Sequence, residues 1–171
     1  DVVAIATAYG YQAKEFSIVS DMVTKTASSS MASVTDMSEA FKQASVVAQQ
    51  YRVSLEDTST AIALLSQVGI RGSAAGTSVR NMYTELMGTS KKARRVLNET
   101  LGVQVWDESA KAMKQLPKIL EEMTGKLSKM TTEGQTRVIQ ALGNERGAKA
   151  LSALLEAVQQ KAQDTGESME T

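Results

Sequence analysis

Apolar residues recur with the period of an α-helix in one segment after another of this sequence. In the clearest segment they stand at positions i, i+4, i+7, i+11 and i+14, namely Met37, Phe41, Ala44, Ala48 and Tyr51. This spacing places all of these side chains on one face of a helix. With similar spacing in the other segments, it predicts a mainly α fold, a compact multi-helix domain of about seven helices.

The composition agrees with this prediction. Hydrophobic residues make up 42% of the chain, but aromatic residues make up only 4%, and there is a single proline. Ala, Met, Leu, Glu, Gln and Lys carry most of the chain, and these are strong helix formers. A β-sandwich or a β-barrel would need more β-branched and aromatic residues at period two.

Capping signals predict where the helices begin. A weak helix over residues 13–27 fades into a Ser/Thr-rich connection at residues 26–35, whose side chains compete for backbone hydrogen bonds. The helices that follow have clearer capping residues at their N-termini. They are Asp36 with Glu39, Ser54 with Asp57, Ser73, Ser90, Pro117 at a first helical position, Thr132 with Gln135, and Gly143-Asn144 between the last two helices.

The period changes in one place. Residues 103–106 alternate, the turn formers Asp107, Glu108 and Ser109 follow, and residues 111–114 are a candidate partner. This predicts a short β-hairpin near residues 103–114. An isolated hairpin is marginal in water, so we expect this one to rest on helices.

Three segments make up the predicted domain organisation. Residues 1–34 form an N-terminal helical segment with its Ser/Thr-rich connection, residues 35–165 form a helical core domain, and residues 166–171 form a tail. The first residue is Asp1 rather than Met, so we expect the chain to be a piece of a longer protein.

Several functional classes find no support. The chain has no Cys and no His, which leaves no disulfide, Cys/His zinc site, thiol nucleophile or histidine base. The carboxylate pairs Glu121-Glu122 and Asp107-Glu108 are sequence neighbours, so their side chains diverge. No apolar run approaches the length of a membrane span. We therefore expect no catalytic residue, no cofactor and no metal, and a protein that is not an enzyme.

The glycine-rich segment at residues 69–77 allows two interpretations. It resembles a phosphate cradle that opens a helix, but it lacks the Gly-Lys-Ser/Thr ending and no β-strand precedes it. The favoured interpretation is structural. Gly69 ends one helix, Ser73 caps the next, and Gly76 lets two helix backbones approach closely.

One cluster of cations stands out: Lys91, Lys92, Arg94 and Arg95. A nucleic-acid patch is one interpretation, but no aromatic residues interleave for base stacking. The 19 Lys and Arg residues balance 19 Asp and Glu residues, which favours a solvated face or an acidic partner surface. A helical adaptor and a weak nucleic-acid-binding module both remain open as alternatives.

The most distinctive block of the sequence is residues 69–81, with Gly69, Ile70, Arg71, Gly72, Gly76, Thr77, Arg80 and Asn81 as its motif residues. Together with several other segments, this block resembles the core domain of phage tail tape-measure proteins, the phage minor tail family. Residues 53–57, 61–65, 101–103, 116–120 and 142–148 follow the family's order. Two departures are Leu142, where the family often has Phe, and a hairpin tip of Glu108, Ser109 and Ala110 in place of a Gly-rich one.

The resemblance implies a structural virion protein that lies in the lumen of the tail tube or at the tail tip and is produced in the cytoplasm of a bacterial host. It implies roles in tail-length determination, tail assembly and genome ejection for a phage or prophage. The implied partners are tail-tube proteins, tail-tip or baseplate proteins, tail assembly chaperones and copies of the chain itself. Specific nucleic-acid recognition is not implied.

A molecular ruler should be a long uninterrupted helix, at about 1.5 Å per residue. Between Gly69 and Gly147 this chain places nine glycines and Pro117 in 79 residues. We therefore expect a compact helical module of such a protein and not its measuring portion.

Overall fold

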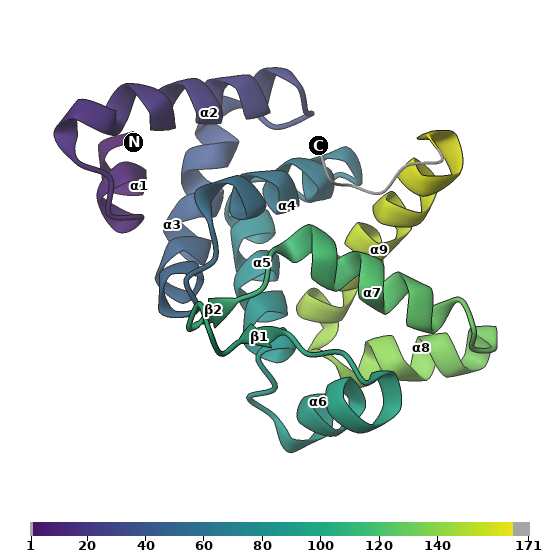
Figure 1. Ribbon diagram of the computed structural model, residues 1–171. Coiled ribbons are helices and arrows are strands. Elements are labelled where there is room, and N and C mark those ends of the chain that lie inside the picture. Colours follow the sequence, from purple (N-terminus) through teal and green to yellow (C-terminus); the bar gives the residue numbers. More distant parts are fainter. Residues whose placement is uncertain (1, 166–171) are drawn as a thin grey trace. The chain divides into compact units, whose positions relative to one another are not determined.

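The computed structural model describes residues 2–165, and these are mainly helical, as predicted (Figure 1). The α-helices in this part of the chain are α1 (Val2–Ala8), α2 (Phe16–Ser28), α3 (Val34–Gln50), α4 (Leu55–Gln67), α5 (Gly72–Leu86), α6 (Lys91–Arg95), α7 (Leu116–Leu127), α8 (Thr132–Ala141) and α9 (Glu145–Thr165). A 3₁₀ turn, η1 (Ala13–Glu15), precedes α2, and a π-helical turn, η2 (Val96–Leu101), continues α6. The described helices number nine, against about seven expected.

Two compact units divide the chain, Asp1–Arg80 and Asn81–Thr171, and their boundary falls within α5. In the first unit α1 packs on α2 and α3, and both α2 and α3 pack on α4. The core of this unit is apolar, as the helical spacing predicted, and includes Val19, Val23, Met37, Phe41, Ile62 and Leu65. Residues 2–28 therefore pack on α3 and α4. The predicted boundary at residues 34/35 stays a prediction.

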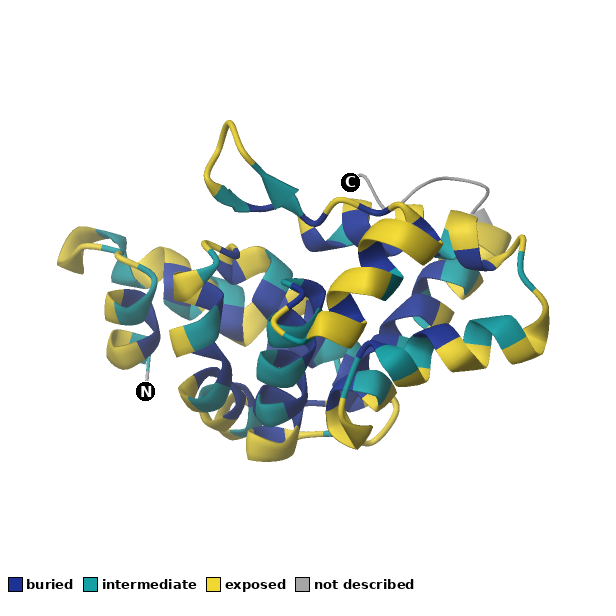
Figure 2. Ribbon diagram, turned by 90° about the horizontal axis from the view of Figure 1, so that it is seen from below, coloured by how far each residue is buried: buried dark blue, intermediate teal, exposed yellow. Residues whose placement is uncertain are grey.

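In the second unit α9 packs on both α7 and α8, and η2 contacts α7. The helices turn buried residues to one side and exposed residues to the other (Figure 2). The buried residues of this unit include Leu97, Leu101, Ile119, Leu120, Met123, Leu151 and Leu155. The predicted tail at residues 166–171 lies outside the described residues.

The helix starts confirm some predicted caps and correct others. Ser54 and Ser90 cap α4 and α6, since each side chain accepts a hydrogen bond from the backbone N–H three residues later. The predicted cap at Asp36 is wrong. Ser33 caps α3, and Asp36 is the third helical residue, whose carboxylate accepts from the Ser33 N–H at 2.8 Å. Both positions fit the same capping pattern, and the helix takes the earlier one.

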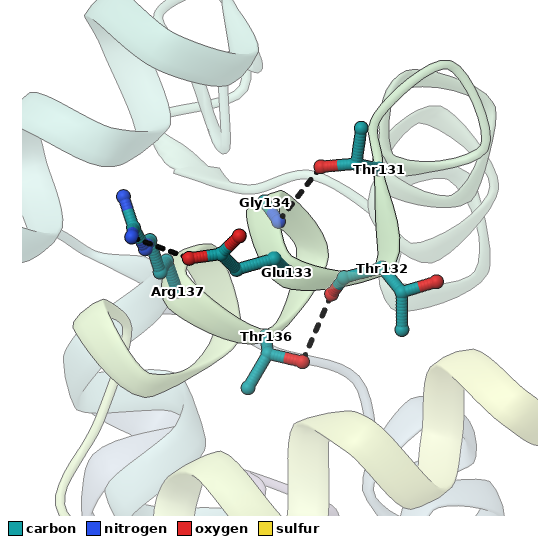
Figure 3. A network of polar contacts seen from close by, with 6 residues as sticks. All are labelled: Thr131, Thr132, Glu133, Gly134, Thr136 and Arg137. Carbon is teal, nitrogen blue, oxygen red and sulfur yellow. Dashed lines mark hydrogen bonds and ion pairs between the residues drawn. The ribbon is translucent and has the colours of Figure 1, made fainter.

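Two further predicted caps are wrong. α5 already begins at Gly72, so Ser73 lies within the helix and is not its cap. Thr131 rather than Thr132 caps α8, because the Thr131 hydroxyl accepts the Gly134 N–H at 3.2 Å (Figure 3).

The predicted hairpin is present but shorter than expected. β1 (Trp106–Asp107) pairs antiparallel with β2 (Ala112–Met113), and Trp106 lies opposite Met113. Of the strand predicted at residues 103–106, only Trp106 belongs to β1, and the buried residues Val103 and Val105 precede it. The apolar and polar residues alternate here because every second side chain is buried in the second unit, and not because the strand pair is longer.

Candidate functional site

The motif at residues 69–81 starts in the loop between α4 and α5. The Gly69 N–H donates to the Ser66 carbonyl at 3.0 Å, and the Ile70 N–H donates to the Leu65 carbonyl at 2.9 Å. These two bonds form the Schellman motif that ends helices, and Gly69 has the left-handed φ of +82° that this motif requires.

Carboxylates of α3 lie close to the start of α5. A Cβ at Gly72 would lie 2.8 Å from Glu39 Oε2 and 3.5 Å from Asp36 Oδ1. The pKa of Asp36 is lowered, mainly by hydrogen bonds from Ser33 and to a smaller extent by the charge of Arg71. Because negative groups already occupy this neighbourhood, the geometry argues against a phosphate cradle here.

Gly76 lies where α5 crosses α3. A Cβ on Gly76 would overlap the Ala40 carbonyl oxygen and would lie 2.7 Å from the Ala40 Cα. Both Ala40 and Ala75 are fully buried beside this crossing. The backbones of the two helices therefore meet directly, and no side chain larger than hydrogen fits between them.

The last motif residue, Asn81, contacts the start of α9. Its side-chain amide donates to Asn144 Oδ1 at 3.4 Å, and the same oxygen accepts the Gly147 N–H at 3.0 Å. A Cβ on Gly147 would lie 3.3 Å from the Asn81 Cβ. Residues 81 and 144–147, which come from two separate motif segments, thus meet in the second unit. Thr77 and Arg80 are half-buried on α5.

The basic cluster lies on α6, and all four of its side chains are exposed. Arg94 Nε donates to the Gly88 carbonyl at 3.3 Å, and Arg95 forms an ion pair of 3.8 Å with Glu99. Both members of that pair are highly exposed, so it contributes at most about 1 kcal/mol. The cluster therefore faces solvent.

A cavity of about 200 Å³ lies beside this cluster in the second unit. Its apolar lining comes from the end of α5, from η2 and from the segment that leads into β1: Leu86, Met87, Leu97, Val103, Val105 and Trp106. Gly88, Arg94 and Asn98 complete the lining. The sequence did not indicate this cavity, because the alternation at residues 103–106 does not tell which residues lie beside η2.

Two cavities lie in the first unit. One of about 170 Å³ lies between α1 and α3, beside Phe41, and one of about 430 Å³ lies near Tyr9 and the turn between α3 and α4. Burial raises the pKa of Tyr9 to about 12. Tyr9 packs edge-on against Phe41 at 6.0 Å, which marks it as a core residue.

The described residues hold no group of three or more Asp, Glu, His or Cys placed to bind a metal ion. None of the helices in that part of the chain is both long and apolar enough to cross a bilayer. The polar network around α8 joins Glu133 to Arg137 and the Thr136 hydroxyl to the Thr132 carbonyl (Figure 3). Both contacts lie within α8. The exposed pair of Glu133 and Arg137 supports the helix weakly, whereas the Thr136 hydroxyl only adds a second donor to a carbonyl of the same helix.

Comparison with known families decides the class of the protein. The family model of the phage-related minor tail protein matches residues 1–144. The chain belongs to this family. The match covers all of residues 69–81, including Gly72 and Gly76, which lie against α3. It ends at Asn144, whose side chain accepts a hydrogen bond from Asn81.

Two phage proteins that are similar to this chain have more specific names. The tape measure protein of Pneumococcus phage Dp-1 is 29% identical over 154 residues, which cover 90% of this chain and 13% of that protein. The probable tape measure protein of Escherichia phage P2 is 29% identical over 141 residues, which cover 81% of this chain and 17% of that protein. The chain thus spans less than a fifth of either relative, and no solved structure matches it.

Proposed function

We propose that this chain is a compact helical module of a phage or prophage tail tape-measure protein. The family match over residues 1–144 carries the proposal, and the similarity to two tape measure proteins over most of the chain supports it. In this role the module has a structural function in the virion and no enzymatic one.

The module is not the measuring portion of such a protein. Its longest described helix, α9, has 21 residues and spans about 32 Å. The glycines at positions 69, 72, 88 and 102 have a positive φ, which interrupts helices at short intervals. A ruler that spans a tail needs a far longer continuous element, which flanking segments would have to provide.

Within the tail the module acts in assembly, in tail-length determination together with the flanking ruler, and in genome ejection. It lies in the tail-tube lumen or at the tail tip. Its partners are tail-tube and tail-tip or baseplate proteins, assembly chaperones and further copies of itself. The contacts of Gly76 and Asn81 with other parts of their own units serve the fold, which leaves other exposed surfaces for these partners.

Gene inactivation in the encoding phage tests this function. A stop codon early in the coding region should give particles without tails, or tails of irregular length, in electron micrographs, and supplying the intact gene should restore normal tails. Mass spectrometry of purified virions should detect the protein. Normal, infectious tails in the mutant would contradict the proposal.

A further inference from the structure

Of the four cations on α6, Arg94 makes a structural contact, a hydrogen bond of 3.3 Å to the Gly88 carbonyl, whereas Lys91, Lys92 and Arg95 contribute little to the stability of the second unit. Lys91 and Lys92 lie in the first turn of the helix, where positive charge opposes the helix dipole. The ion pair of Arg95 with Glu99 is exposed and therefore weak. The positive charge of this basic cluster therefore slightly destabilises the helix and adds little stability to the unit.

The cavity of about 200 Å³ opens beside the same cluster, and Arg94 belongs to both. Six of its lining residues are apolar, and one of them, Trp106, is the only tryptophan of the chain. The π-helical turn η2 supplies Leu97 and Asn98 to the lining. Such turns are rare, and they occur frequently at functional sites.

We propose that this cavity and the cations of α6 form a docking site for an acidic segment of a partner protein. The carboxylates of the segment contact Lys91, Lys92, Arg94 and Arg95, and one apolar side chain of the segment enters the cavity against Trp106. Charge complementarity identifies the acidic character of the partner, and the apolar lining identifies the anchor. The inference rests only on residues 86–106 and does not depend on the proposed function.

A protein segment fits this site better than nucleic acid does. The chain as a whole has zero net charge, so it lacks the extended field that draws nucleic acid to a surface. One aromatic side chain beside a pocket of this size also offers no platform for successive bases. Binding of an oligonucleotide is therefore the outcome that would replace this proposal.

The fluorescence of Trp106 provides a direct test on the intact 171-residue chain, because no other tryptophan contributes. The probe is a synthetic 12-residue peptide with one Leu between four Glu residues. We expect it to shift the Trp106 emission saturably and to bind more weakly as salt is added. A peptide with Ser in place of the Leu should bind at least about tenfold more weakly, which corresponds to about 1.4 kcal/mol.

Charge-reversal variants separate this site from general electrostatic attraction. Lys91→Glu combined with Lys92→Glu should weaken the peptide at least about tenfold while the thermal unfolding midpoint does not fall, since acidic residues suit a first helical turn. The matched control is Lys126→Glu with Lys129→Glu, an equal charge change at exposed residues around the end of α7, and it should bind like the unmodified chain. Any of three results would overturn the proposal. The peptide does not shift the Trp106 emission, both double variants weaken peptide binding equally, or a 12-residue oligothymidylate binds more tightly than the peptide.

Discussion

Among the described glycines, Gly76 leaves the least room for a side chain. Alanine at this position would gain up to about 1 kcal/mol in helix propensity. Its Cβ, however, would overlap the Ala40 carbonyl oxygen, so α3 and α5 would have to move apart. We expect Gly76→Ala to lower the free energy of unfolding by about 1–3 kcal/mol, as overpacking does.

Gly125 in α7 is the matched control for this prediction, because a Cβ there would meet no atom within 4 Å. Gly125→Ala should leave stability unchanged or raise it by up to about 1 kcal/mol. Chemical-denaturation midpoints measure both changes. If Gly76→Ala were as stable as Gly125→Ala, the close approach of the two backbones would be disproved.

Arg52 ends α3 with the geometry that Gly69 uses to end α4. The Val53 N–H donates to the Ala48 carbonyl at 2.8 Å, the Arg52 N–H donates to the Gln49 carbonyl at 3.0 Å, and Arg52 has a φ of +55°. A side chain in this left-handed conformation costs about 1–2 kcal/mol. Arg52→Gly should therefore stabilise the chain by about 0.5–1 kcal/mol, after the greater freedom of glycine in the unfolded chain is subtracted.

The reverse change at Gly69 completes the comparison. No atom lies within 4 Å of a Cβ there, so only backbone strain should act, and Gly69→Ala should destabilise by about 1 kcal/mol. Thermal or chemical denaturation would detect opposite signs at the two positions. Destabilisation by Arg52→Gly would show that the Arg52 side chain makes a contribution that outweighs the strain.

At the scale of the element, the N-terminus of α3 depends on the capping pair Ser33 and Asp36. The Asp36 N–H donates to Ser33 Oγ at 3.0 Å, and the Asp36 carboxylate accepts from the Ser33 N–H and Oγ–H, both at 2.8 Å. Removing the hydroxyl by Ser33→Ala should cost about 1 kcal/mol. Thr131→Ala at the start of α8 should cost a similar amount, within about 0.5–2 kcal/mol.

The lowered pKa of Asp36 makes part of this stability depend on pH. A carboxyl group with a lower pKa in the folded chain stabilises the fold above its unfolded pKa of about 3.9, and this stabilisation is lost as the pH falls through the folded pKa. Asp36→Asn should therefore be less stable than the unmodified chain at pH 7, and the difference should shrink toward pH 2. A difference that is constant over this range would show that the charge of Asp36 is not involved.

Element boundaries also show how far the sequence could predict this structure. Ser54 was predictable, because it is the one good cap directly before its apolar run. Ser90 was predictable because Ser is a stronger cap than its neighbour Thr89. At α3 and α8 a second capping residue lies within three positions, and local propensity does not choose between them.

The small residues around Gly76 predicted a close approach of two helices, but only the structure identifies Ala40 as the neighbour. The cavity beside Trp106 depends on tertiary packing among residues 86–106, which the linear pattern does not specify.

On the scale of the whole molecule, this phage tail protein folds its short helices into two compact units, and no described helix has the length of a ruler. If residues 2–165 were one continuous helix, they would span about 250 Å. In the structure no described helix exceeds 21 residues. The contribution of this segment to tail length should therefore be small compared with that of flanking sequence of equal length.

Tail length in the encoding phage tests this claim most directly. An in-frame duplication of residues 2–165 in the full-length gene should change the length of assembled tails in electron micrographs by much less than about 250 Å. An equally long duplication in a flanking helical segment should lengthen the tails by close to that amount. Tails that grow by about 250 Å when residues 2–165 are duplicated would contradict the account.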